Sequence, residues 1–325
     1  MMNLAGFQSE MGIARMTIRL SESLARYTTA RIGGLADVLM EAASAKELKS
    51  IVKAARKWEL PITILGGGAN VLVSEAGIRG LVIVNKAKRI EFRAGAQVWC
   101  ESGTVLPALA RECVARGLAG LEWAVGVPGT VGGAVVGNAG AHGRDVAADL
   151  LSATILNEVN EVSEWSREEL QFAYRGSRIK RGAGSNPTGA LRGMQDAGNK
   201  SHAIRNTQYV VLAATFQLTP ADSIELTKKA DEFNDYRRRT QPPGASIGSM
   251  FKNPPGEAAG RLIDQCGLKG TRIGDAEIST VHANFFVNHG QATASEVKAL
   301  IDLAQWRVKE KFGIALELEI ELLGE

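Results

Sequence analysis

Short apolar runs alternate with amphipathic segments along most of the chain, which predicts alternating strands and helices. We predict strands at 37–40, 61–65, 81–84, 151–156, 209–217, 284–288 and, closing the chain on an alternating pattern, 314–323. A helix with one apolar face is predicted after Ser44, which would cap it together with Glu47 three residues later. Further helices are predicted at 104–116, from about 221 to 240, at 257–266 and at 294–312.

The composition supports a folded protein with a substantial core. The chain has 325 residues, of which 45% are hydrophobic and 22% are charged, and this excludes intrinsic disorder. At about 150 residues per domain, the length predicts about two domains. The net charge of +3 lacks the concentrated basic excess of nucleic-acid-binding domains, so we expect no nucleic-acid partner.

Cysteine usage and hydropathy indicate a cytoplasmic setting. Three cysteines are an odd count without a CxxC spacing, which favours neither a disulfide framework nor a zinc site and is typical of a reducing cytosol. We expect no metal. Residues 1–26 contain no apolar run long enough for a signal peptide, and no run approaches a membrane span. We therefore expect a weakly structured leader at 1–26 and no membrane association.

Glycine is in excess, with 36 residues, or about 11% against a usual 7%. Gly66 to Gly68 directly follow a predicted strand, and a second run covers 126–133. Glycine accepts positive φ and lets a ligand approach backbone N–H groups. Neither run matches the dinucleotide or P-loop fingerprints, and one run alone is more often a tight turn. Two runs beside strands predict a large phosphate-bearing cofactor held by both.

A set of motifs in a fixed order now points to a family. They are TTARIGG at 28–34, GGGAN at 66–70, GVPGTVGGA at 126–134, NAGAHG at 138–143, YRGS at 174–177, GSMFKNP at 248–254, AGRLI at 259–263, GLKG at 267–270, HANF at 282–285 and LELEI at 316–320. With them the chain resembles the bacterial UDP-N-acetylenolpyruvylglucosamine reductases, or UDP-N-acetylmuramate dehydrogenases. These are flavoproteins of peptidoglycan precursor synthesis, and so of cell-wall biogenesis, cell shape and cell division.

The resemblance implies an α+β fold with a vanillyl-alcohol-oxidase-type (PCMH-type) FAD-binding region of two α+β subdomains, plus a C-terminal α+β substrate domain. We place the leader at 1–26, the FAD-binding subdomains at 27–86 and 87–220, and the substrate domain at 221–325. An insertion at 181–207, read as a mobile surface segment or a loop without a role, interrupts the second subdomain. The resemblance further implies non-covalent FAD, NADPH as electron donor, a UDP-sugar substrate and a monomer.

The FAD would lie between the two glycine runs. The residues implied to bind it are Gly66, Gly67, Gly68, Ala69, Asn70, Pro128, Gly129, Thr130, Gly132, Gly133, Asn138, Gly140 and Gly143. Ala69 replaces a usual serine and removes one hydroxyl contact, while His142 replaces a common tyrosine and puts that contact in doubt. Residues 181–207 contain no tyrosine, which resembles the subtype without a tyrosine-bearing lid loop.

The implied reaction adds a hydride from flavin N5 to C3 of an enolpyruvyl group and a proton to C2. It needs a cation near the developing enolate and a proton donor near C2. The motifs assign these roles to Arg175, Ser249 and Glu319. Taken alone, the same residues would be a surface ion pair, a turn or capping serine, and one carboxylate of a solvated strand face. Glu317 and Glu321 share that face by period two.

Substrate contacts are implied for Tyr174, Arg239, Lys252, Asn253 and His282, although His282 fits a structural role equally well. Two other functions stay open on the residues alone. One is an alcohol oxidase on the same flavin fold, which uses O2. The other is a flavin- or nucleotide-binding module without catalysis.

Overall fold

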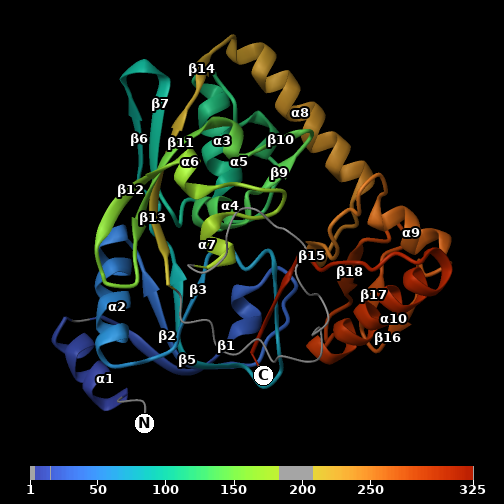
Figure 1. The fold of residues 1–325 in the computed structure, drawn as a ribbon, viewed down its shortest axis with the longest axis horizontal. Coiled ribbons are helices and arrows are strands. Elements are labelled where there is room, and N and C mark those ends of the chain that lie inside the picture. Colours follow the sequence, from blue (N-terminus) through green and yellow to red (C-terminus); the bar gives the residue numbers. More distant parts are fainter. Residues whose placement is uncertain (1–3, 15, 183–207, 325) are drawn as a thin grey trace.

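The computed structural model describes residues 4–14, 16–182 and 208–324, and its first sheet is mostly parallel (Figure 1). The strand order is β1-β2-β5-β3, with β2, β5 and β3 parallel and β1 antiparallel to β2. The strands are β1 (Ile18–Ser23), β2 (Leu35–Ala42), β3 (Ile62–Leu65) and β5 (Ile78–Asn85). Helix α2 (Ala45–Lys57) buries Leu48 and Ile51 in a core shared with Ile83.

A second, antiparallel sheet of five strands lies against the other side of α2. Its order is β12-β11-β13-β7-β6. The strands are β6 (Ile90–Arg93), β7 (Gln97–Glu101), β11 (Leu150–Leu156), β12 (Val162–Ser166) and β13 (Val210–Gln217). Leu156 and Leu212 join the core under α2, whereas α3 (Leu106–Ala115) and α4 (Val131–Gly137) pack on the opposite face. Helix α2 therefore lies between two sheets.

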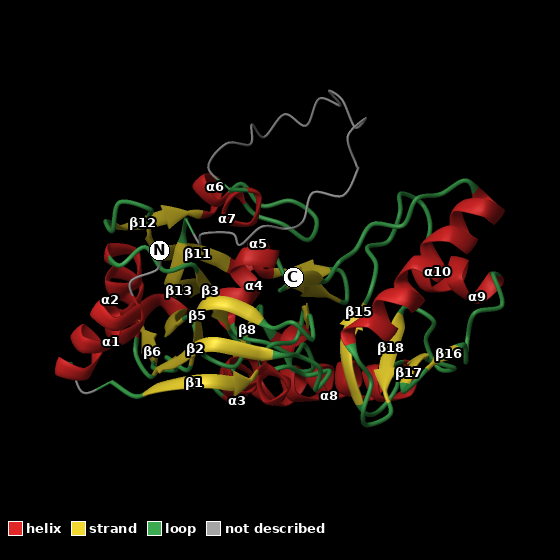
Figure 2. Cartoon of the chain, turned by 90° about the horizontal axis from the view of Figure 1, so that it is seen from below, coloured by secondary structure: helices red, strands yellow, loops and turns green. Residues whose placement is uncertain are grey.

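A third region carries an antiparallel sheet of order β15-β18-β17-β16, covered by two helices (Figure 2). Its elements are β15 (Ala245–Ser249), α9 (Ala259–Gln265), β16 (Arg272–Ile273), β17 (Ala276–Ile278), β18 (Phe285–Asn288) and α10 (Ala294–Phe312). Helix α10 starts at a capping box formed by Thr293 and Glu296 and ends at Gly313, whose φ is +69°. Before this region, α8 (Ser223–Thr240) buries Leu226 and Ala230 in the core of the second region.

The first and third regions interlock. The last strand, β19 (Glu321–Leu323), pairs in parallel with β4 (Val71–Val73), so the C-terminal end, red in Figure 1, lies among the blue strands. In the other direction, Ala30 and Ile32 are buried in the core of the third region. Each region thus contributes residues to the packing of the other.

The remaining elements are short. They are α1 (Leu4–Ile13), η1 (Leu24–Tyr27), η2 (Ala94–Ala96), β8 (Leu118–Ala119), η3 (Glu122–Ala124), β9 (Gly140–Ala141), β10 (Arg144–Asp145), α5 (Val146–Asp149), α6 (Arg167–Leu170), α7 (Arg178–Arg181) and β14 (Thr219–Pro220). No helix among the described residues is long and apolar enough to cross a membrane.

Most predicted elements are confirmed to within a few residues, and α10 matches 294–312. Two expectations are wrong. Residues 1–26 are not weakly structured where they are described, because they form α1 and β1, and β1 pairs with β2. The closing strand covers only β19, because the chain from 314 to 320 packs Leu316 and Ile320 in the core of the third region and forms a single bridge, between Leu318 and Phe251. The insertion at 181–207 lies, apart from its first two residues, outside the described chain, and the domain boundaries stay a prediction.

Candidate active site

The two glycine runs face each other. A Cβ added to Gly66 would lie 2.2 Å from Thr130 Oγ1, and one added to Gly67 would lie 3.1 Å from the Cα of Gly129. The predicted convergence of the two runs is therefore confirmed. Because a side chain at Gly66 or Gly67 would crowd the opposite loop, both positions favour glycine, and here the two loops expose backbone groups.

The first loop is seated on the segment that precedes the first sheet. Gly68 has φ of +60°, and a Cβ there would lie 2.0 Å from the carbonyl oxygen of Tyr27. The N–H of Thr29 donates to the Gly68 carbonyl at 3.0 Å. Only glycine satisfies both the left-handed backbone and this close approach.

The second loop leads directly into α4. The N–H groups of Val131 and Gly132 donate to the carbonyls of Thr104 and Ser102, which holds the loop on the end of β7. Among the described residues, the buried hydroxyl of Thr104 has no hydrogen-bond partner. Buried polar groups normally find a partner. Two backbone-lined loops and a buried hydroxyl without a partner fit a polar ligand such as the phosphates and ribityl chain of FAD.

Other predicted FAD residues are distributed unevenly around these loops. Pro128 lies in the second loop, and Gly132 and Gly133 lie in the first turn of α4. A Cβ at Gly129 would lie 3.9 Å from the methyl group of Ala69, so Ala69 lies close to the opposite loop. Gly143, with φ of +77°, lies in the turn between β9 and β10.

The segment 317–321 connects the first loop with the third region. Glu319 donates its N–H to the Met250 carbonyl at 2.9 Å, while its own carbonyl accepts from Asn70 Nδ2 at 3.1 Å. Ser249, the last residue of β15, immediately precedes Met250. The structure therefore brings Asn70, Ser249 and Glu319 into one neighbourhood, although they come from widely separated motifs.

Arg175 completes this group from the second region. Its Nε lies 2.8 Å from Glu319 Oε1, and one terminal nitrogen donates to the Gly140 carbonyl at 2.9 Å. Burial raises the pKa of Glu319 above its ordinary value, although Arg175, Lys180 and Lys252 each act to lower it. The result is a cation fixed beside a carboxyl that binds a proton more readily than an exposed glutamate.

The three alternating glutamates differ in their partners and exposure, and the catalytic role of Glu319 stays a prediction. Glu317 pairs with Lys252 at 3.2 Å, and Glu321 pairs with Lys180 at 3.3 Å. Their side chains are 68% and 41% exposed, against 17% for Glu319. Glu319 is thus the half-buried carboxylate that contacts Arg175. Sequence reasoning missed Lys180, whose only signal is its position five residues after Arg175.

Several predicted substrate residues have structural partners. The Asn253 side-chain oxygen accepts from the Ala259 N–H at the start of α9. His282 Nδ1 accepts from the Asn284 N–H, and burial lowers the pKa of this histidine. For His282 these contacts favour the structural role, and its substrate contact stays a prediction.

The other predicted substrate residues are more exposed or lie apart. Tyr174 is 59% exposed, and its ring lies under the Arg175 guanidinium, 5.4 Å from centroid to Cζ. Arg239 donates from Nε to the Asp235 carbonyl within α8. No contact in the described chain joins it to Arg175 or Glu319.

His142 has a defined place although its family counterpart is usually tyrosine. Its ring stacks on Phe233 of α8 with centroids 4.1 Å apart and meets the edge of Tyr236. Within the described residues its buried Nε2 has no hydrogen-bond partner. Burial, followed by the charge of Arg237, lowers its pKa, so the ring is neutral at pH 7. It therefore supplies an aromatic surface, as a tyrosine would.

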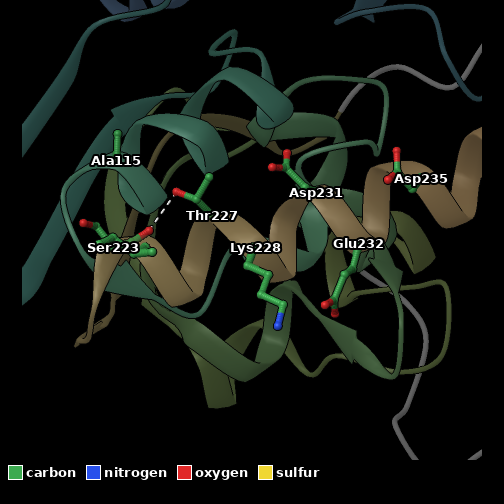
Figure 3. A pocket seen from close by; sticks show the side chains of 8 residues that line it. Ala115, Ser223, Thr227, Lys228, Asp231, Glu232 and Asp235 are labelled. Atoms are coloured by element: carbon green, nitrogen blue, oxygen red, sulfur yellow. Dashed lines mark hydrogen bonds between the residues drawn. The ribbon is translucent and has the colours of Figure 1, made fainter.

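A surface hollow contains no predicted site residue, although the carbonyl of Asp235, which lines it, accepts a hydrogen bond from Arg239. It runs along α8 and is lined by Ala115, Ser223, Ile224, Thr227, Lys228, Asp231, Glu232 and Asp235 (Figure 3). None of these is a predicted site residue, and Thr227 only donates to the Ser223 carbonyl of its own helix. The hollow gives no reason to move the candidate site from the Arg175–Glu319 pair.

Comparisons with known proteins agree with this geometry. A family model described as FAD binding domain matches residues 36–166, and one described as UDP-N-acetylenolpyruvoylglucosamine reductase, C-terminal domain, matches residues 240–323. Together they place the chain among FAD-binding oxidoreductases with a PCMH-type region and a C-terminal substrate domain, as the motifs predicted.

Full-length relatives then give the family. UDP-N-acetylenolpyruvoylglucosamine reductases of Rubrobacter xylanophilus and Chloroflexus aurantiacus are 43% and 41% identical, over 94% and 95% of this chain and 95% and 98% of theirs. The crystal structure of this reductase from Thermus caldophilus superposes with a TM-score of 0.75 at 34% identity, over 95% of this chain and 99% of that one. The chain belongs to this family, the UDP-N-acetylmuramate dehydrogenases of peptidoglycan synthesis.

Proposed function

We propose that this chain reduces the enolpyruvyl ether of UDP-N-acetylglucosamine to UDP-N-acetylmuramate, with NADPH as electron donor and FAD held non-covalently between the two glycine loops. The residues proposed to contact the cofactor are Gly66 to Gly68, Ala69 and Asn70 on one side, and Pro128, Gly129, Thr130, Gly132, Gly133, Gly140 and Gly143 on the other; Asn138, also predicted, is considered below. FAD, when bound, supplies hydride transfer from N5 to C3 of the enolpyruvyl group. The steps below concern the side chains of the chain itself.

The half-buried pair of Arg175 and Glu319 is the observation that carries this proposal. A guanidinium held in place stabilises negative charge that develops on the substrate carboxylate, and it does so best where water is largely excluded. Because burial raises the pKa of Glu319, this carboxyl can take part in holding or passing a proton near the same atoms.

Ser249 is proposed as the proton donor to C2. A serine hydroxyl is a weak acid, so it needs a charged neighbour or a relay to donate well. Ser249 precedes the residue whose carbonyl binds Glu319 N–H, which brings it close to the Arg175–Glu319 pair along the backbone. Tyr174, Arg239, Lys252, Asn253 and His282 are proposed to bind the UDP-sugar. We also propose a cytoplasmic monomer of the subtype without a tyrosine lid.

The test separates the two half-reactions under anaerobic conditions. Wild-type protein and Ser249→Ala are loaded with FAD, reduced with NADPH and then mixed with the enolpyruvyl substrate, while flavin absorbance is followed by stopped flow. We expect normal reduction in both proteins. Reoxidation of Ser249→Ala should be at least about 100-fold slower, the usual size of a general-acid contribution. Equal reoxidation rates would exclude Ser249 as the donor.

The same preparation tests the two alternatives. A purified protein that is colourless and takes up no FAD would exclude any flavoenzyme. A reduced flavin that is reoxidised by O2 with an alcohol substrate, and not by the enolpyruvyl ether, would indicate an oxidase on this fold.

A further inference from the structure

The side chain of Asn138, predicted to bind FAD, is fully engaged within the protein. Asn138 is 4% exposed. Its Nδ2 donates to Asp145 Oδ2 at 3.0 Å and to the Ala173 carbonyl at 3.1 Å. Its Oδ1 accepts from the Ala147 N–H at 3.1 Å. An asparagine amide has two donor hydrogens and one acceptor oxygen, so both groups already have protein partners.

One of these partners belongs to the turn that presents Arg175. Ala173 and Gly176 exchange both backbone hydrogen bonds, N–H to carbonyl in each direction, and close a tight turn around Tyr174 and Arg175. Arg175 has φ of +55°, a left-handed conformation that costs roughly 1–2 kcal/mol for a residue with a Cβ. A strained residue keeps such a conformation only where its surroundings fix it.

The end of α4 supplies those fixed surroundings. Asn138 is the C-cap of α4, with φ of +44°, and it holds the Ala173 carbonyl. Ser177, which is fully buried, donates its hydroxyl to the Val136 carbonyl at 2.7 Å. The Arg175 side chain itself donates to the Gly140 carbonyl. Residues 136–140 thus hold the turn at three points: at Ala173 before it, at Ser177 after it, and at the Arg175 guanidinium.

We propose that Asn138 is a positioning residue, which holds the Arg175 turn against the end of α4 so that the guanidinium meets Glu319. The predicted effect of Asn138 on the reaction rate rests on the proposed function, whereas its effect on the conformation of the 173–176 turn does not. The Asp145 carboxylate accepts from the same Nδ2 group, and this bond orients the Asn138 amide with its nitrogen toward Asp145 and Ala173. Because α4 begins in the second glycine loop, one short helix connects that loop to the Arg175 turn.

The experiment uses Asn138→Gly in the full chain. Glycine accepts the left-handed backbone of this position, so the substitution removes the amide without adding strain. The matched control is Asn160→Gly, because Asn160 also has positive φ, +67°, and its side-chain oxygen also accepts a hydrogen bond, from Arg56, in the distant turn between β11 and β12. Asn160→Gly loses one side-chain hydrogen bond and Asn138→Gly loses three, so the control accounts for the change to glycine at a left-handed position and not for the number of bonds lost.

Three measurements are made on each protein: FAD affinity by fluorescence titration, the two half-reactions by stopped flow, and hydrogen exchange at the Gly176 amide. For Asn138→Gly we expect FAD affinity and flavin reduction within about twofold of wild type. Reoxidation by the enolpyruvyl substrate should slow by about 10- to 100-fold, the effect of a misplaced catalytic group. The Gly176 amide should exchange at least tenfold faster. Asn160→Gly should change none of these.

The outcomes separate this proposal from the proposed function. A parallel loss of FAD affinity would show that Asn138 contacts the cofactor and would overturn the positioning role. Unchanged exchange at Gly176 would overturn it as well. If the wild-type flavin were not reoxidised by the enolpyruvyl substrate, the proposed function would fail, while the exchange measurement would still decide whether Asn138 holds the turn.

Discussion

The third region meets the first and second regions through two different kinds of junction. Its junction with the first region is made mainly of strand pairing, apolar packing and hydrogen bonds that involve backbone groups: β19 pairs with β4, Ala30 and Ile32 enter its core, and the Glu75 carboxylate accepts from the Ser295 N–H. Apart from α8, its junction with the second region is made of charged side chains, namely Arg175 with Glu319 and Lys180 with Glu321.

The two junctions therefore differ in how they respond to pH and salt. Sheet pairing and apolar packing do not depend on protonation, whereas ion pairs respond to pH and salt. The candidate catalytic pair lies at the junction where charge can change. We infer that one junction fixes the position of residues 317–321, and the other lets the electrostatics of Arg175 and Glu319 vary with bound ligand.

The largest effect is expected from Gly68→Ala, which disturbs the segment that leads to Ala30 and Ile32 at the backbone junction. The added methyl would lie 2.0 Å from the Tyr27 carbonyl at a φ of +60°, so clash and strain together should destabilise the protein by about 3 kcal/mol. Chemical unfolding measures this. Gly95→Ala is the control, because Gly95 also has positive φ but open space around it, and it should cost only roughly 1 kcal/mol. Equal losses would refute the role of the clash.

A smaller loss is expected where α8 meets the second region. Glu122 is 3% exposed and pairs with Lys229 at 2.7 Å. Burial alone would raise the pKa of Glu122, but Lys229 and the Gly120 N–H outweigh it and keep the pKa below its ordinary 4.5. Lys229→Met removes the cation and leaves this carboxylate with the Gly120 N–H, so it should cost about 2 kcal/mol at pH 7.

The pH dependence of that loss has a definite sign. With a lowered folded pKa, the stabilisation by Glu122 is present above pH 4.5 and is lost as the pH falls through the folded value. Wild type and Lys229→Met should therefore converge in unfolding free energy on acidification. Lys228→Met, at an exposed position of the same helix, should have the unfolding free energy of wild type both at pH 7 and after acidification. A constant difference between wild type and Lys229→Met would contradict this account.

The smallest effect tests the charged junction through Glu319→Gln. Because the folded pKa of Glu319 is raised above 4.5, its contribution is fully present below that pH and is lost as the pH rises through the folded value. Glutamine cannot titrate. As the pH rises from about 4 to 7, wild type should therefore lose stability relative to Glu319→Gln, and thermal melting at several pH values would show this. The same substitution at the largely exposed Glu317 is the control. A difference that moved in favour of wild type would mean that Arg175 outweighs burial.

Much of the fold could be predicted from local pattern. Helix α10 combines an apolar stripe with a capping box and a terminal glycine, so period and caps agree. The stretch 314–320 alternates like a strand, yet it forms only a single bridge, between Leu318 and Phe251, and only the segment after it joins β4, because that pairing depends on tertiary contacts. Helix α1 packs Leu4, Phe7 and Met11 in the core around α2; their spacing of three and four residues is helical, but it extends over only ten residues.

The candidate site was predictable in its residues but not in its connections. Arg175, Ser249 and Glu319 stand in recognisable motifs, and period two left Glu317 and Glu321 as alternatives. Burial decides among them, and burial is a property of the assembled chain. Asn138 sits in a glycine-rich motif that suggests ligand contact, whereas its amide is used to hold a distant turn. Sequence spacing carries no signal for that bond.

The route of the last strand has a consequence for how the protein is made. Asn70 and Glu319, which share a hydrogen bond, are 249 positions apart, and β4 has only β19 as its sheet partner in the described chain. During synthesis β4 stays unpaired until residues 321–323 have left the ribosome. Because Glu319 belongs to the same segment, the Arg175–Glu319 pair cannot form before this segment emerges, so assembly of the site depends on the same late pairing step as β4.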